Sequence, residues 1–143
     1  MINLSTVNTV DLLTKVTKSV VIHGFNFTEA LEHTLKQCPA LGKHSGLIHL
    51  TPGCVTRYIW AHREYQPWGT RLPLQCPQCG VLNSWSLAYL KSGGYKVECK
   101  NKDCGKIGGK RERERHSLQV LRPEGSILQN VGKKGGWLKT SAN

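Results

Sequence analysis

The chain has 143 residues, 38% of them apolar, and a net charge of +11 from 20 lysines and arginines against 9 acidic residues. This length allows one domain or two very small ones. No stretch approaches the roughly 18 apolar residues that span a bilayer, and the N-terminus lacks the basic-then-apolar pattern of a secretory signal. We therefore expect an intracellular protein, of the nucleus or cytoplasm, with no membrane partner.

The N-terminal part of the chain, residues 1–55, predicts a small α/β unit. Residues 19–23 form a short β-branched run that is typical of a strand, and residues 46–50 predict a second short strand. Between them, apolar residues at helical spacing follow Thr28, a suitable helix N-cap. Strand, helix and strand together predict a βαβ-like unit with parallel strands over residues 19–51.

A basic and aromatic stretch, residues 56–75, follows as a predicted linker. Tyrosines and tryptophans alternate there with Arg57, Arg63 and Arg71. Its first half is compatible with a short helix, and prolines and a glycine predict an ordered loop for the rest. Further along the chain, residues 117–121 predict a strand, and the Gly- and Lys-rich residues 123–143 predict a flexible basic tail.

Four cysteines, Cys76, Cys79, Cys99 and Cys104, are spaced as C-x2-C and C-x4-C with nineteen residues between the pairs. Two disulfides, a redox pair or a metal site would each explain close cysteine pairs. Disulfides are rare in the reducing intracellular compartment that we expect, and no thioredoxin-like strand–helix unit surrounds the C-x2-C pair. The spacing therefore favours a metal site, and four thiolates suit one tetrahedral zinc ion.

The segment between the two pairs predicts a β-hairpin. Residues 84–91 and 95–100 alternate bulky with small or polar side chains, and residues 92–94, Ser-Gly-Gly, can form the turn. Residues 76–106 therefore resemble a zinc ribbon, and the resemblance implies one structural zinc ion held by the four cysteines. With the following strand, this domain would cover residues 76–122. The predicted fold class is α+β.

Charge indicates the kind of partner. Residues 57–143 carry sixteen basic and six acidic residues, whereas residues 1–56 carry four and three. We therefore expect nucleic acid, either DNA or RNA, to bind a basic surface around the ribbon. The candidate contacts are Arg57, Arg63, Arg71, Lys100, Lys102, Lys106, Lys110, Arg111, Arg113 and Arg115.

Two other functions remain open at this point. The alternative is that the zinc-bearing chain is a docking or assembly module for an acidic protein partner. A Cys- and His-dependent hydrolase fragment would use His23, His49 and Cys54, if these residues lay at the ends of adjacent parallel strands. No Gly-rich phosphate loop, nucleophile elbow or paired-carboxylate motif accompanies them, so we expect a chain that is not an enzyme. The pattern does not indicate an oligomeric state.

Overall fold

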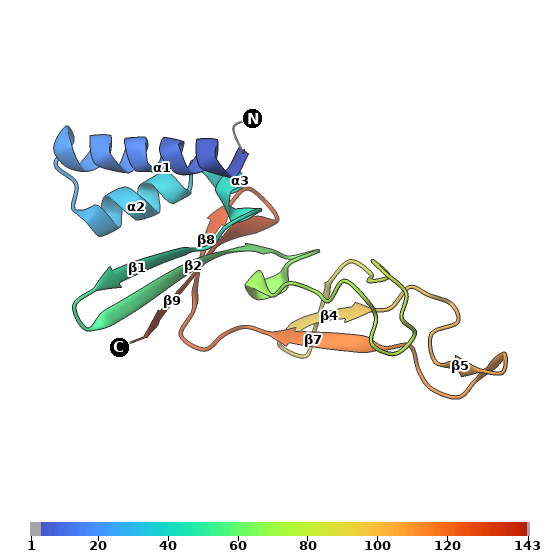
Figure 1. The fold of residues 1–143 in the computed structure, drawn as a ribbon. Coiled ribbons are helices and arrows are strands. Elements are labelled where there is room, and N and C mark those ends of the chain that lie inside the picture. The colour runs from blue at the N-terminus through green and yellow to red at the C-terminus, as the bar shows by residue number, and fades with distance from the viewer. Residues whose placement is uncertain (1–3, 143) are drawn as a thin grey trace. The chain divides into compact units, whose positions relative to one another are not determined.

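The computed structural model describes residues 4–142 and divides the chain into two compact units (Figure 1). Residues 1–60 and 125–143 belong to the first, here called the helix–sheet unit, and residues 61–124 form the second, the cysteine unit. The cysteine unit is thus inserted into the sequence of the helix–sheet unit. The chain is a mixed α+β protein, with helices first and antiparallel strand pairs after them.

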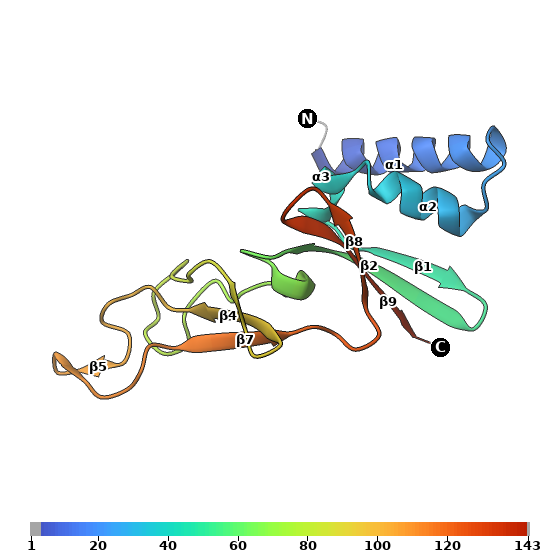
Figure 2. The same ribbon diagram turned by 180° about the vertical axis from the view of Figure 1, so that it is seen from behind.

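The helix–sheet unit begins with three helices, α1 (Leu4–Val21), α2 (Phe27–Leu35) and α3 (Pro39–Gly42). The side chain of Asn26 caps α2 by accepting a hydrogen bond from the backbone N–H of Glu29 at 2.9 Å. Both ribbon views show α1 and α2 on one face of the sheet (Figures 1 and 2). None of the helices within residues 4–142 is long and apolar enough to cross a membrane.

A four-stranded sheet completes this unit, in the order β1 (Leu47–Thr51), β2 (Cys54–His62), β9 (Gly135–Ala142) and β8 (Ile127–Val131). Strands β1 and β2 form an antiparallel hairpin, and so do β8 and β9. Thr56 of β2 contacts Ser141 of β9, and Trp60, further along β2, contacts Trp137, which comes earlier in β9. The strands β2 and β9 are therefore also antiparallel.

The core lies between the helices and this sheet. Trp60 and Trp137 meet edge to face with ring centroids 5.7 Å apart, and the indole N–H of Trp137 donates to the carbonyl of Leu35 at 2.7 Å. Other buried members are Leu12, Val16, Ala30, Leu31, Cys38, Leu41 and Tyr58. Because β9 supplies Trp137 to this core and Val131 of β8 packs against it, the C-terminal strands are part of the unit's structure.

The cysteine unit is built from a three-stranded antiparallel sheet, in the order β3 (Tyr89–Lys91), β4 (Gly94–Glu98) and β7 (Ser117–Leu121). A two-stranded ribbon, β5 (Lys106–Ile107) and β6 (Lys110–Arg111), and a short 3-10 helix at Pro67–Gly69 complete it. Ser92 and Gly93 turn the chain between β3 and β4 with positive φ values of 48° and 78°. Such values suit a tight hairpin turn, so the predicted hairpin is confirmed.

Several expectations for individual elements are wrong. The predicted strand at residues 19–23 is the end of α1 and the turn after it, so no βαβ unit exists over residues 19–51. Leu12 and Val16 bury one face of α1, and this packing outweighs the strand preference of the β-branched run. The strands predicted at residues 46–50 and 117–121 are confirmed as β1 and β7.

Two further segments differ from their predictions. Residues 55–64 were expected to form a short helix, but most of them belong to β2, where Thr56, Tyr58 and Trp60 alternate inward with the period of a strand. Residues 123–143 were predicted as a flexible tail, yet they contain β8 and β9. Residues 1–3 and 143 lie outside the described residues.

Candidate metal centre

The four cysteines predicted as ligands come together in the cysteine unit. All four Sγ atoms lie within 4.8 Å of one another, with Cys76 to Cys104 at 4.0 Å and Cys79 to Cys99 at 3.7 Å. A tetrahedral ion with metal–sulfur bonds of about 2.3 Å places its sulfurs about 3.8 Å apart. A disulfide would require about 2.05 Å, and the cysteines are free. The cluster could therefore hold one metal ion such as zinc.

The first cysteine pair sits on a turn. The backbone N–H of Gly80 donates to the carbonyl of Cys76 at 2.8 Å, and the N–H of Cys76 donates to the carbonyl of Val81 at 3.0 Å. Gly80 takes a φ of +74°, which glycine adopts at little cost. The side-chain amide of Gln75 closes the turn by donating to the Gly80 carbonyl at 2.8 Å. This turn fixes Cys76 and Cys79 on one side of the cluster.

The second pair is held by the strands. Cys99 directly follows β4, and its N–H donates to the carbonyl of His116 at 2.8 Å. Cys104 ends a turn in which its N–H donates to the carbonyl of Asn101 at 3.1 Å. Trp85 packs against the cluster and pairs with Cys99 in an isolated β-bridge. The β-sheet therefore positions the second half of the ligand set.

Hydrogen-bond donors surround the sulfurs. The backbone N–H of His116 and the side-chain amide of Gln78 both donate to Cys104 Sγ at 3.4 Å, whereas the Cys99 thiol donates to Ser84 Oγ at 3.2 Å. Hydrogen bonds from the side chain of Asn101 and the backbone of Val81 lower the pKa of Cys79 to about 6. These donors stabilise thiolate charge, which is the form that binds metal.

Burial acts in the opposite direction on Cys104. It raises the pKa of this thiol to about 11, because a buried thiolate without a counter-charge is poorly solvated. A bound cation would supply the missing counter-charge and displace the proton. Metal affinity at this cluster should consequently fall as the pH is lowered.

Gly105 allows the chain to turn tightly after the last cysteine. Its φ is +84°, and a Cβ atom built at this position would overlap the backbone carbonyl oxygen of Arg113. The Gly105 carbonyl accepts hydrogen bonds from the N–H groups of Glu112 and Arg113 at 3.0 and 2.9 Å. This close contact of Gly105 could not be predicted from the sequence. His116 and Ser84, which also contact the cysteine cluster, are not part of any sequence motif that would place them there.

All ten basic residues that were proposed as nucleic-acid contacts have exposed side chains. Seven of them lie within residues 100–115, here called the basic segment, which runs from the second cysteine pair through β5 and β6. Arg63 and Arg71 lie elsewhere in the cysteine unit, and Arg57 lies in the helix–sheet unit. Seven of the ten are thus close to one another in the sequence, and the structure leaves all seven exposed.

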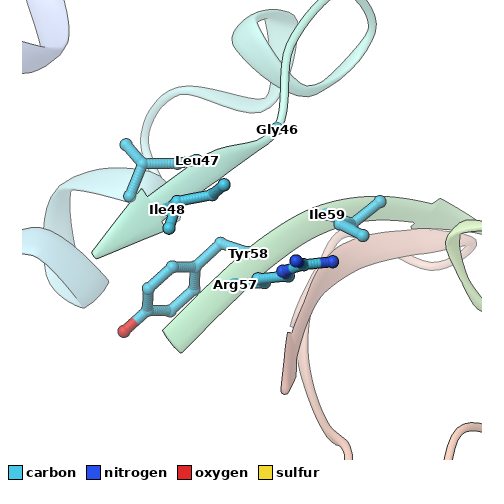
Figure 3. A pocket seen from close by; sticks show the side chains of 6 residues that line it. All are labelled: Gly46, Leu47, Ile48, Arg57, Tyr58 and Ile59. Carbon is cyan, nitrogen blue, oxygen red and sulfur yellow. The ribbon is translucent and has the colours of Figure 1, made fainter. Parts of the chain in front are cut away.

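Arg57 occupies different surroundings from the other nine. It lies on the open face of the four-stranded sheet, beside a hollow of about 380 Å³ that Gly46, Leu47, Ile48, Tyr58 and Ile59 also line (Figure 3). Gly46 leaves this hollow open because it has no side chain there. Arg57 is therefore a member of a largely apolar surface and belongs to a different unit from the basic segment.

The positive charge is divided between the two units more evenly than between residues 1–56 and residues 57–143. The cysteine unit contains twelve basic and six acidic residues, and the helix–sheet unit contains eight and three. Their net charges are thus +6 and +5. The expected excess around the cysteines is smaller than in the linear sequence because Arg57 of β2, Lys139 of β9, and Lys133 and Lys134 of the turn between β8 and β9 belong to the helix–sheet unit.

The aromatic residues of the predicted linker have separate roles. Tyr58 and Trp60 are core residues of the helix–sheet unit. Trp68 packs against Tyr95 with ring centroids 5.6 Å apart, under the guanidinium of Arg122. Tyr65 is 49% exposed and stacks on the His62 ring with centroids 3.7 Å apart. A set of aligned aromatic faces, as an unpaired strand of nucleic acid would require, is thus not formed by these four side chains.

The arrangement expected for a Cys–His pair is also wrong. His23 follows the end of α1 and not a strand, and β1 and β2, which carry His49 and Cys54, are antiparallel. The His49 ring packs on Phe27 with centroids 5.0 Å apart, and Cys54 Sγ lies 3.8 Å from Thr56 Oγ1. The three residues do not lie at the carboxyl ends of adjacent parallel strands.

A scan against protein-family models, a search of curated proteins and a search of solved structures each found no match for this chain. The assignment of the metal centre therefore rests on the four thiols and on the groups around them.

Proposed function

We propose that the protein is a zinc-stabilised module that binds nucleic acid through its basic segment. The observation that carries this proposal is that seven exposed basic side chains lie on a segment anchored at both ends to the cysteine cluster. Cys99 and Cys104 hold its beginning, and the N–H of His116, one residue after its end, contacts Cys104 Sγ at 3.4 Å. Metal binding would give this segment a fixed shape.

Zinc is the metal that the ligand set supports best. Four cysteine sulfurs at tetrahedral spacing are typical of structural zinc sites in proteins. Because all four positions are taken by protein thiolates, no position remains for water or a substrate. The ion would therefore organise the chain and would not catalyse a reaction.

The charge of the basic segment supports a polyanionic partner. Residues 100–115 include seven basic and three acidic residues. Asp103 pairs with Lys106 at 2.8 Å, and this pair is exposed to solvent. Lysine and arginine contact nucleic-acid phosphates irrespective of base sequence, and each contact releases counterions. We therefore expect binding that is sensitive to salt and weakly specific for sequence.

The test is fluorescence anisotropy with the zinc-loaded full chain and labelled single- and double-stranded DNA and RNA, at several salt concentrations. Replacing Lys100, Lys102 and Lys110 with Gln should lower the slope of log affinity against log salt by about 2–3, since each lost phosphate contact contributes roughly 0.7–0.9. The matched control replaces Lys18, Lys36 and Lys43 with Gln, three exposed lysines of the helix–sheet unit. It removes the same net charge and should leave most of the slope in place.

Equal losses in the two triple variants would show that net charge, and not the basic segment, carries the binding. Absence of binding by the wild-type chain at low salt would refute the proposed function. The metal centre is tested separately, by the number of zinc ions bound per chain.

A further inference from the structure

Strand β1 is an edge strand of the four-stranded sheet and lacks the features that usually protect such an edge. It pairs with β2 on one side, and within residues 4–142 no strand pairs with its other side. Natural proteins protect such edges with lysines, prolines or bulges, because the unpaired N–H and C=O groups can pair with another strand. The sequence of β1, Leu-Ile-His-Leu-Thr, contains none of these, and Ile48 and Leu50 are 60% and 71% exposed.

Apolar surface continues from β1 toward the helices. A groove of about 350 Å³ beside the strand is lined by Leu12, Leu13, Val16 and Thr17 of α1, by Phe27 and Leu31 of α2, and by residues 47–50. No Lys, Arg, Asp or Glu lines it. Leu13 and Phe27 are 60% and 50% exposed at its border. An added strand would therefore meet apolar side chains on both faces of the sheet.

The opposite edge of the sheet is better covered. In β8, Leu128, Gln129 and Val131 are all half-buried. Val131 also packs against the main core. The edge at β1 thus combines open backbone groups with the more exposed apolar side chains.

We propose that β1 pairs antiparallel with β1 of a second copy of this chain, so that the two sheets join across a two-fold axis. With the axis at His49, Ile48 lies opposite the partner's Leu50, and the partner's Ile48 lies opposite Leu50. These residues occupy the same face of each strand, since side chains alternate along a strand. The five-residue strand is therefore complementary to itself in this register, as an isologous interface requires.

Charge favours this edge for self-association. A chain with a net charge of +11 repels its own copies, so an interface must avoid like charges. Strand β1 has no Lys, Arg, Asp or Glu. The nearest guanidinium in the sheet is Arg57 on β2, opposite Ile48. Three strand spacings separate it from the partner's Arg57, about 14 Å, which exceeds the Debye length of about 8 Å at physiological salt.

The exposed apolar side chains at this edge supply about half of a stable interface. Leu13 and Phe27 of the groove and Ile48 and Leu50 of β1 are each between 50% and 71% exposed. With roughly 100–200 Å² for a full side chain of this size, they expose on the order of 350 Å² per copy. Specific dimers bury about 800 Å² per partner, and the paired strand backbones and intervening polar side chains would supply the remainder.

Sedimentation velocity of the zinc-loaded full chain at 5–200 μM tests the proposal. The wild type should sediment as a dimer at the upper concentrations. Leu50→Lys adds a charge at the edge and should leave a monomer, with the dissociation constant of the dimer raised at least tenfold. Ile127→Lys is the matched control, because Ile127 is also exposed, at 57%, but lies on the opposite edge strand β8. This control should remain dimeric.

Hydrogen exchange keeps the proposal testable if Leu50→Lys fails to fold. The edge-facing backbone amides of wild-type β1 should become more protected as protein concentration rises, and those of β8 should not change. A monomer at 200 μM, a dimer unaffected by Leu50→Lys, or protection at β8 in place of β1 would each overturn the inference. It does not depend on the proposed nucleic-acid function.

Discussion

The helix–sheet unit has a continuous core of aliphatic and aromatic side chains, whereas the buried cluster of the cysteine unit consists of Cys76, Cys99 and Cys104 with Cys79 and Trp85 beside them. The first arrangement is stabilised by removal of apolar surface from water. The second brings four thiols together, so we expect its stability to depend on a metal ion. On this proposal, one short chain contains two units that differ in the source of their stability.

We expect that one unit can unfold while the other stays folded. The cysteine unit, residues 61–124, is inserted between β2 and β8 of the helix–sheet unit. If it unfolded, it would act as a long loop between these strands. The entropy of closing a loop rises only slowly with length, by about 0.6 kcal/mol for each doubling. The helix–sheet unit should therefore remain folded when the cysteine unit loses its metal.

The largest expected effect comes from Cys99→Ser. This change removes one of four ligands and should eliminate most of the metal-binding free energy, which is on the order of 10 kcal/mol for structural zinc sites. Hydrogen exchange should show loss of protection in β4 and β7 and retained protection in β2 and β9. The control is Cys54→Ser, a cysteine outside the cluster. Protection of β4 in a metal-free variant would contradict the proposed difference between the units.

A core substitution should produce the reverse pattern. Trp137 is completely buried and donates a hydrogen bond to Leu35, so Trp137→Ala should destabilise the helix–sheet unit by about 3–5 kcal/mol. Urea unfolding followed by circular dichroism at 222 nm measures this, because all α-helices within residues 4–142 lie in that unit. The exposed Val21→Ala should change stability by about 0.5 kcal/mol or less. Loss of bound metal from Trp137→Ala would argue against two separate units.

Gly105→Ala tests the turn after the last cysteine, and we expect it to cause an intermediate loss of stability. Its Cβ would overlap the Arg113 carbonyl, so we expect a loss of about 2 kcal/mol or more, seen as weaker metal binding in competition with a chromophoric chelator. Gly109→Ala shares a positive φ but meets open space, so it should cost only about 1 kcal/mol. Equal affinities for the two variants would show that the close backbone approach is unimportant.

The smallest effect concerns acid stability of the helix–sheet unit. Burial tends to raise the pKa of Glu32, but hydrogen bonds from Lys139, at 2.5 Å, and from the Tyr58 hydroxyl, at 3.0 Å, outweigh it and lower this pKa below 4.5. Because the folded-state pKa is the lower one, the stabilisation is complete above pH 4.5 and is lost as the pH falls through the folded value.

Glu32→Gln should therefore remove a contribution of about 1–2 kcal/mol at neutral pH and flatten the dependence of stability on pH below 4.5. The measurement is urea unfolding at 222 nm between pH 3 and 7. Lys43→Gln, which changes an exposed charge of the same unit, is the control. An unchanged pH profile for Glu32→Gln would show that this ion pair does not contribute.

The sequence was most informative where residue identity decides the structure. Cysteine spacing predicts the ligand set, and the Ser-Gly-Gly turn predicts the hairpin, because each depends on the chemistry of a few adjacent residues. The strands predicted at residues 46–50 and 117–121 are also confirmed as β1 and β7.

Elements that depend on distant partners were not predictable in the same way. The C-terminal strands resemble a Gly- and Lys-rich tail, and only the packing of Trp137 against Trp60, 77 positions earlier, shows that they belong to a core. The same applies to α1, whose β-branched end is helical because Leu12 and Val16 pack inward. The division of charge between the units likewise depends on the return of β8 and β9 to the first unit.

Native mass spectrometry of the purified chain, combined with hydrogen exchange before and after chelation, tests the central claim most directly. We expect one zinc ion per chain, and chelation should abolish protection in β4 and β7 while β2 and β9 keep theirs. No bound metal in a reduced protein with a protected β4, or collapse of both units on chelation, would contradict it.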